Sequence, residues 1–424
     1  MLEKQVMKIL LKQAKIIDPS SSFNNEQKDI LIEKGQIVEI KDQIKEDKKY
    51  TIIQSSDLHV SKGWIDLKAH FCDPGQEYKE TLESGLEKAA KGGFTRVGVL
   101  PSTTPVMDQR ISIDSLHRKA AKSLTGVIPM GCLSKQMEGK ELAELYDMQI
   151  AGAALFTDDR LSTDAAVLSN ALMYAQNFEG KIVVSLGNSS LSKNIQVNEG
   201  EASLKTGLKG DPIISEIIEI ERHLRVLEYS GGSLHISGVS TQHGATLIAK
   251  AKKKGLSVTA EAHVMNLCFD ESEVLEFNTR FKTLPPLRNK KDTKSLVKSL
   301  SEGAIDCVVS NHRPTDEDEK EVDFENATFG APHVQTLFSA MNTNTQLKLN
   351  ELISILSDRP ANIIGITTRP IEKNSVADIT IFDPNENFDA STLSSKDKKY
   401  SPFDLSKLKG KVIGVVRDGK FNMN

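Results

Sequence analysis

Polar side chains that could bind a metal or move a proton recur where short apolar runs of the sequence end. Imidazole, carboxylate and amine groups carry most of this chemistry in proteins. Taken singly, each residue is more simply explained as a loop cap or a hydrogen-bonded structural group. Their recurrence after successive runs predicts a shared pocket. The residues are Lys68, His70, Ser102, Thr103, Asp158, Asp159, Ser185, Asn188, His235, His263, Asn311 and His312.

The apolar runs that carry these residues alternate with longer segments of helical periodicity, such as 79–93 and 212–232. Eight strand and helix units in this order predict an α/β protein with a (β/α)8 barrel over residues 63–364. The carboxyl ends of such strands meet at one face, where active sites lie. The runs cover residues 63–71, 95–103, 126–134, 152–159, 181–188, 232–241, 257–263 and 304–312.

The two ends of the chain have a different hydrophobic pattern. Residues 8–54 contain short alternating runs around Gly35, and similar runs return at 376–384 and 410–421 beside Asp-Pro and Asp-Gly turns. We therefore expect a small β-sandwich domain built from residues 1–62 together with 365–424.

Composition excludes several classes of function. The 424 residues hold 54 Lys and Arg against 58 Asp and Glu, a net charge of −4, so nothing predicts binding to nucleic acid. No stretch of about 18 apolar residues predicts a membrane span, and no signal peptide is recognisable. The 4 cysteines form no CxxC pair, which favours a reducing, cytoplasmic setting and argues against a thiolate zinc site. Translation could start at Met1 or at Met7.

The segment GWIDLKAHFCDPGQEYKETLESGLEKAAKGGFTRVGVLPSTTPVMD at 63–108 resembles the opening of dihydroorotases, members of the cyclic amidohydrolase superfamily, of the type that accompanies aspartate transcarbamoylase. The resemblance continues through FTDD at 156–159, HISGVST at 235–241, LPPLRNKKD at 284–292 and EGAIDCVVSNHRP at 302–314. It implies the barrel with its composite β domain, and hydrolysis of dihydroorotate by a zinc-bound hydroxide.

The resemblance also implies where the metal ligands and the proton carrier should lie, and most of these positions are changed. An HxH pair on the first strand is here Lys68-Ala69-His70, and the lysine ammonium has no lone pair for a cation. Asp159, or alternatively Asp158, matches the bridging carboxylate of the fourth strand. The histidines of the fifth and sixth strands correspond to Ser185 and Gly238. The catalytic aspartate of the eighth strand is Asn311, followed by His312.

The positions that grip the substrate carboxylate in the family differ as well. Cys72 and Ser102 stand where the family has an arginine and an asparagine, and Leu284 replaces another asparagine. A cysteine cannot make the two-pronged cationic contact that an arginine makes.

We therefore expect a non-catalytic member of this family with no resident metal; His70 and Asp159 are the ligands if any ion binds. Two protein ligands fall short of the three that are usual in a catalytic zinc site. We further expect Lys68 to pair with Asp159 or Asp158 and to replace the metals electrostatically. The resemblance implies a structural or regulatory role beside aspartate transcarbamoylase, as a homodimer or in a larger assembly.

Three alternatives remain open from the sequence. One is an active dihydroorotase, or a related zinc-dependent cyclic amidohydrolase, with an atypical site that adds His263, His235 or His312 to His70 and Asp159. Another is a sensor that binds a small pyrimidine precursor at the polar barrel mouth. A third is a nucleophilic role for Cys72 next to His70 or His312.

Overall fold

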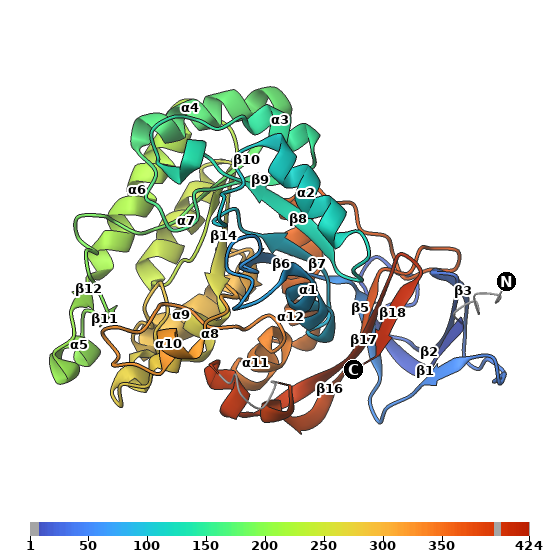
Figure 1. Ribbon diagram of the computed structural model, residues 1–424. Helices are drawn as coiled ribbons and strands as arrows, with labels where there is room; N and C mark the ends of the chain where they lie inside the picture. Colours follow the sequence, from blue (N-terminus) through green and yellow to red (C-terminus); the bar gives the residue numbers. More distant parts are fainter. Residues whose placement is uncertain (1–7, 394–399, 424) are drawn as a thin grey trace.

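The computed structural model describes residues 8–393 and 400–423 of the chain (Figure 1). The two alternative start residues, Met1 and Met7, lie outside the described residues. Within them, no helix combines the length and the apolar character that a membrane crossing requires.

The predicted (β/α)8 barrel is confirmed. Eight parallel strands lie side by side in chain order, and each corresponds to one of the predicted runs. A parallel bridge between Ala69 and His312 closes the ring, with the His70 amide donating to the His312 carbonyl at 2.8 Å. The strands are β6 (Trp64–Ala69), β7 (Phe94–Val99), β8 (Gly126–Gly131), β9 (Leu155–Phe156), β10 (Lys181–Val184), β13 (Leu234–Ile236), β14 (Val258–His263) and β15 (Cys307–Val309).

Helices surround this ring because each presents one apolar face to it (Figure 1). In α1 (Leu82–Lys91), Thr81 caps the first turn by accepting the Ser84 amide, and the buried face includes Leu86 and Ala89. The other main helices are α2 (Arg110–Ala120), α3 (Leu145–Ile150), α4 (Ala165–Ala175), α6 (Ile213–Ser230), α7 (Gln242–Lys253), α9 (Lys290–Ser301), α11 (Leu337–Asn344), α12 (Leu349–Leu356) and α13 (Asp358–Ile363).

Loops and short elements after the strands build the barrel mouth. They include β11 (Val197–Asn198), α5 (Glu201–Thr206), β12 (Gly210–Asp211), α8 (Val264–Cys268) and α10 (Glu317–Lys320). The lower interior is apolar, since Leu67, Ile128, Met130 and Val183 are buried there. The pocket therefore opens at the carboxyl ends of the strands.

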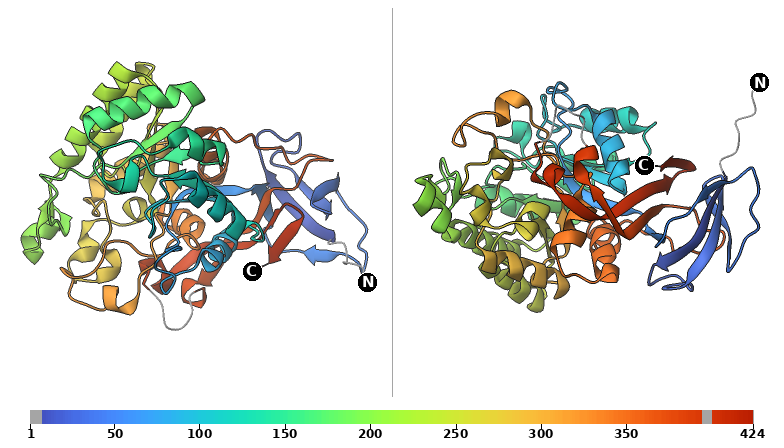
Figure 2. Two further views of the ribbon diagram at one scale, coloured as in Figure 1. Left: turned by 45° about the horizontal axis from the view of Figure 1, so that its top comes forward. Right: turned by 90° about the horizontal axis from the view of Figure 1, so that it is seen from below.

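Strands from both chain ends form one hydrogen-bonded sheet beside the barrel (Figure 2). β5 lies between β1 and β16, and Val60 faces Ile381 in the antiparallel register. The strands are β1 (Lys8–Ile17), β2 (Gln27–Glu33), β3 (Gln36–Lys41), β4 (Thr51–Ile53), β5 (His59–Lys62), β16 (Ile379–Asp389), β17 (Lys407–Arg417) and β18 (Lys420–Met423).

The long β16–β17 ribbon ties this sheet to the barrel. Figure 2 shows it running from the N-terminal strands to the barrel helices. Phe382 of β16 packs against Trp64 of β6 with ring centroids 5.2 Å apart, and Trp64 also contacts Phe338 of α11 at 4.5 Å. These aromatic side chains belong to the main barrel core, whereas residues of the N-terminal strands such as Ile9 and Ile32 pack in a separate cluster of the terminal sheet.

Candidate functional site

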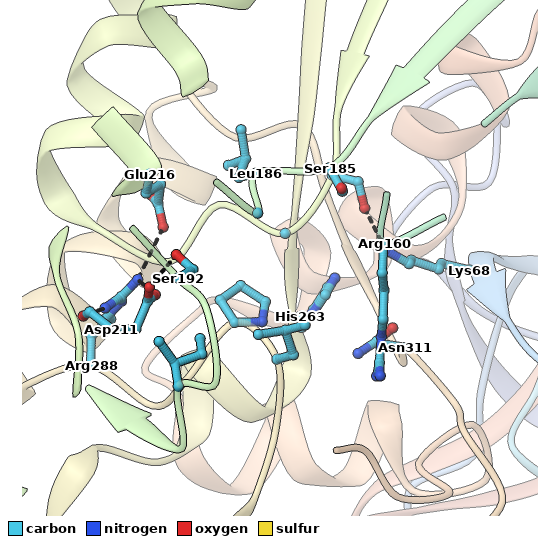
Figure 3. Close-up of a pocket in the computed structure, with 16 residues that line it drawn as sticks. Lys68, Arg160, Ser185, Leu186, Ser192, Asp211, Glu216, His263, Arg288 and Asn311 are labelled. Atoms are coloured by element: carbon cyan, nitrogen blue, oxygen red, sulfur yellow. Dashed lines mark hydrogen bonds and ion pairs between the residues drawn. The ribbon is translucent and has the colours of Figure 1, made fainter. Parts of the chain in front are cut away.

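A pocket opens at the carboxyl ends of the barrel strands (Figure 3). Its cavity volume is about 60 Å³, which is room for roughly four to six water-sized groups. Figure 3 places His263 in the middle, with Arg288, Asp211 and Glu216 on one side and Lys68, Arg160 and Asn311 on the other. Ser185, Leu186, Gly187, Ser192, Ile195, Ser237, Gly238, Leu284 and Pro285 complete the lining.

Lys68 is the penultimate residue of β6, and its amine lies in the pocket. Its Nζ donates to Ser237 Oγ at 2.6 Å, and that hydroxyl donates to Glu261 Oε1 at 2.6 Å. Glu261 lies 4.0 Å from Lys68 Nζ and 3.2 Å from His235 Nε2. The contacts with His235 and Lys68 hold the pKa of the Glu261 carboxyl well below its usual range despite burial, which by itself would raise it. The predicted cationic centre therefore exists, and Glu261 is its nearest carboxylate.

The predicted pairing of Lys68 with Asp159 or Asp158 is wrong. Asp159 forms an ion pair with Arg313 and accepts a hydrogen bond from Ser102 Oγ at 2.8 Å. Arg313 follows the eighth strand, and its side chain extends across the mouth to form the ion pair with Asp159. Desolvation alone would raise the pKa of Asp159, but the charges of Arg313 and Lys68 lower it far below its usual range.

His70 is engaged by backbone atoms of the loops after β6 and β7. Its Nε2 lies 2.9 Å from the Ser102 carbonyl, so Nε2 carries the proton, and Nδ1 accepts the Cys72 amide at 3.2 Å. Burial, with Arg313 nearby, lowers the His70 pKa to about 4. The Cys72 thiol lies 3.3 Å from Nδ1, yet burial raises its pKa to about 12. A thiol in that state is a poor nucleophile, which argues against the role considered for Cys72.

Asp158 and His312 do not line the pocket. Asp158 accepts the amides of Leu133 and Ser134, each at 2.9 Å, and so fastens the loop after β8. His312 contacts Glu80 through Nε2 at 2.6 Å, while its Nδ1 accepts the His333 amide at 3.1 Å. Both are structural groups at strand ends.

Three strand ends leave polar atoms or space in the pocket. Gly238 has a φ of +79°, and a Cβ there would lie 3.1 Å from His263 Cε1, so the imidazole fills the space that a side chain would need. Both ring nitrogens of His263 and Oδ1 of Asn311 are buried without a hydrogen-bond partner in the part of the chain that the structure describes. His263 is held neutral, because burial and Lys68 place its pKa well below the usual value.

Comparison with known proteins identifies the family of this chain. A family model described as dihydro-orotase-like matches residues 59–244. The chain is 35% identical to the dihydroorotase of Syntrophus aciditrophicus, over 98% of this chain and 99% of the relative. It is also 35% identical to the dihydroorotase of Aquifex aeolicus, with the same coverage. The chain belongs to the dihydroorotase family.

Solved structures support the fold of this dihydroorotase-family chain. The L-hydantoinase (dihydropyrimidinase) from Arthrobacter aurescens superimposes with a TM-score of 0.83 at 23% identity, covering 97% of this chain and 95% of the hydantoinase. A D-hydantoinase gives a TM-score of 0.81 at 22% identity. At these identities the likeness concerns the barrel and the terminal sheet alone.

The residues present do not fit the zinc ions that dihydroorotases imply. Over residues 8–393 and 400–423, no three His, Cys, Asp or Glu side chains gather in a way that could hold a metal ion. Asp159 is paired with Arg313, and the ring nitrogens of His70 are both engaged by backbone atoms. The ammonium of Lys68 offers a cation no lone pair.

Several residues that shape the site were missed from the sequence. Arg160 and Arg313 directly follow the strand-end residues Asp159 and His312, and Glu261 lies two residues before His263. Their position next to the predicted residues was the available signal. Arg288 lies in the matched LPPLRNKKD segment but shows no spacing that announces its role.

Proposed function

We propose that this chain is a non-catalytic member of the dihydroorotase family in pyrimidine biosynthesis, with a structural or regulatory role. The observation that carries the proposal is the Lys68 ammonium, hydrogen-bonded to Ser237 Oγ at 2.6 Å in the pocket where the family holds its metals. In its ammonium form this side chain repels a metal ion and has no lone pair with which to bind one.

The charges around Lys68 support the same conclusion. Burial lowers the pKa of Lys68, the carboxylates of Glu261 and Asp159 oppose this shift, and the charges of Arg313 and Arg160 add to it. Two arginines and a lysine thus share the mouth. A catalytic zinc site needs about three protein ligands. Here the remaining acceptors, Asp159 and Glu261, are already engaged by cations.

The proton carrier is also changed. By the resemblance to the family, Asn311 corresponds to its catalytic aspartate, and the Asn311 side chain lines the pocket. An amide does not ionise at neutral pH and cannot pass a proton between the attacking water and the leaving nitrogen. Loss of this group would leave the family reaction without its acid and base even if an ion were supplied.

A second candidate is an active dihydroorotase with an atypical metal arrangement, and the names of the relatives favour it. Both candidates are tested by metal content per chain, measured after purification without chelator and again after dialysis against zinc. Dihydroorotate hydrolysis is assayed on the same samples, with the Aquifex aeolicus dihydroorotase in parallel. We expect metal far below one ion per chain and no turnover; stoichiometric metal with turnover would establish the second candidate.

The partner we propose is aspartate transcarbamoylase, because the sequence resembles the type of dihydroorotase that accompanies that enzyme. The test is co-expression of the two chains and measurement of the mass of the purified assembly and of transcarbamoylase activity with and without this chain. A stable complex supports the proposal. Separate elution with unchanged transcarbamoylase activity and stability would refute the role.

A further inference from the structure

Two lysines are buried in the loops that follow β14 and β15, at the rim of the pocket. Lys282, in the β14 loop (269–289), and Lys320, in the β15 loop (310–336), are each 2% exposed. Neither ammonium forms an ion pair with a carboxylate in the part of the chain that the structure describes; both contact backbone carbonyls. Lysine side chains are almost never fully buried unless an opposite charge is paired with them, so these two are exceptions.

Each lysine holds the loop opposite to its own. Lys282 Nζ donates to the Phe324 carbonyl of the β15 loop at 2.6 Å. In return, Lys320 Nζ donates to the Thr279 carbonyl of the β14 loop at 3.0 Å, and also to the Thr328 carbonyl of its own loop at 2.8 Å. The two side chains therefore form a reciprocal clasp between the loops.

The clasp lies beside residues that line the pocket. Leu284 and Pro285, which belong to the lining, follow Lys282 closely in the chain. Arg160, another lining residue, donates to the Phe329 carbonyl of the β15 loop at 3.1 Å. Separation of the two loops would therefore widen the pocket, whose volume is about 60 Å³ with both loops in place.

The charges that face the clasp do not compensate for its burial. Burial lowers the pKa of Lys282 to about 8, and the charge of Glu325 opposes this shift. Burial also lowers the pKa of Lys320 to about 7; the charges of Lys282 and Arg160 add to the shift, and that of Glu319 opposes it. The closed clasp thus binds its protons weakly.

Exposure to water would restore proton binding. The ordinary lysine pKa is 10.5, so both side chains hold a proton over the whole neutral range once the loops have separated. The carbonyl acceptors and the rings of Phe324 and Phe329, 5.3 and 4.9 Å from Lys282 Nζ, favour the ammonium form in the closed state but do not replace its hydration. Opening must therefore take up protons from the solvent.

We propose that Lys282 and Lys320 form a proton-linked clasp at the rim of the pocket, and that the β14 and β15 loops separate as the two amines take up protons and close as they release them. Linkage gives the sign: the open state binds more protons, so opening is most frequent at or below pH 7 and becomes rarer as the pH rises. The clasp requires neither a metal nor turnover. Stoichiometric zinc with dihydroorotate hydrolysis would overturn the proposed function and leave the clasp untouched.

Hydrogen–deuterium exchange of the full chain from pH 6 to pH 9, followed by mass spectrometry and corrected for the intrinsic exchange rate at each pH, measures the opening of residues 313–330. We expect the opening constant to change by about twofold between pH 6 and pH 7, and to fall about tenfold or more between pH 7 and pH 9. The β7 loop (100–109) contains no lysine and is the internal control, with no change expected. An opening constant of residues 313–330 that does not depend on pH overturns the proposal.

Substitutions assign the protons to the two amines. Lys320→Met and Lys282→Met each keep a long unbranched side chain but remove one amine, so each should reduce the pH dependence, and the double substitution should abolish it. Lys254→Met, at the exposed end of α7, should behave as wild type does. Faster exchange with an unchanged pH dependence in the folded variants would mean that the lysines only hold the loops in place, and would refute the proton linkage.

Discussion

Two arginines lie on opposite sides of one pocket, and their surroundings are opposite. Arg288 is 2% exposed and donates to Ser240, Asn198, the Asp211 carbonyl and the Asp211 carboxylate at 2.8 to 3.0 Å. Arg160 is partly exposed and donates to one backbone carbonyl. The carboxylates around Arg288 are in turn held by hydroxyls and amides, as Thr241 and Ser240 hold Glu216.

The difference indicates how buried charge contributes to structure. A network with every donor and acceptor paired fixes a loop, and breaking it leaves uncompensated charge. On this basis the Arg288 side of the pocket holds the structure together, whereas the Arg160 side contributes fewer paired interactions.

The largest expected effect is on the scaffold side. Arg288→Met strands the carboxylates of Asp211 and Glu216 in a buried place, and we expect a loss of about 3 to 5 kcal/mol in the free energy of unfolding. Urea denaturation followed by circular dichroism measures it. Arg225→Gln, at an exposed pair with Glu228, is the matched control and should change the value by less than about 0.5 kcal/mol. A small loss for Arg288→Met would remove the contrast on which the comparison depends.

The second-largest expected effect is a loss in the free energy of unfolding at low pH, caused by His70 at the barrel mouth. The pKa of His70 is about 4 in the folded chain against an ordinary value of 6.5, so the unfolded chain binds the proton first. The contribution of His70 to the free energy of unfolding is complete above pH 6.5. It is lost as the pH falls toward 4, because the unfolded chain binds the proton more readily, and the loss amounts to about 3 kcal/mol at 1.36 kcal/mol per pKa unit. Unfolding measured at pH 7 and pH 4.5 should show a smaller pH dependence in His70→Gln than in wild type. The exposed His243→Gln should behave as wild type does.

Gly238 tests the space that His263 fills. Gly238→Ala meets both a left-handed backbone and the imidazole at 3.1 Å, and we expect a cost of about 1 to 3 kcal/mol. Gly255→Ala is the matched control, because Gly255 has a φ of +84° and no atom lies within 4 Å of the place that its methyl group would take. Equal costs at the two glycines would mean that His263 is free to move aside.

The smallest effect on the free energy of unfolding is expected at Arg160. Arg160→Gln removes an unpaired cation from beside Arg313, so the free energy of unfolding should change by less than about 1 kcal/mol and could rise. Urea denaturation measures this. A loss as large as that of Arg288→Met would make both arginines structural.

The sequence predicted the barrel well because its signal is repeated eight times. Apolar runs that end in polar residues specify strands and the face where they converge. The changed metal positions could be predicted as well, since each lies inside a matched segment with its own flanking residues. The interaction partners of those residues could not be predicted, because several charged side chains lie near each of them and their positions in space decide which pair forms. Arg313 reaching Asp159, and Ser237 joining Lys68 to Glu261, are decided by side-chain reach across strands distant in the chain.

The pairing of β5 with β16 has a consequence for synthesis of the chain. Val60 cannot meet Ile381 until about 320 further residues have left the ribosome, which takes roughly 15 to 60 s at ordinary elongation rates. Throughout that interval the N-terminal strands expose an apolar edge with no C-terminal partner, while the barrel strands can already pair in order. The terminal sheet can therefore be completed only late in synthesis. Truncated chains that end before β16 should aggregate or be degraded more readily than the full chain.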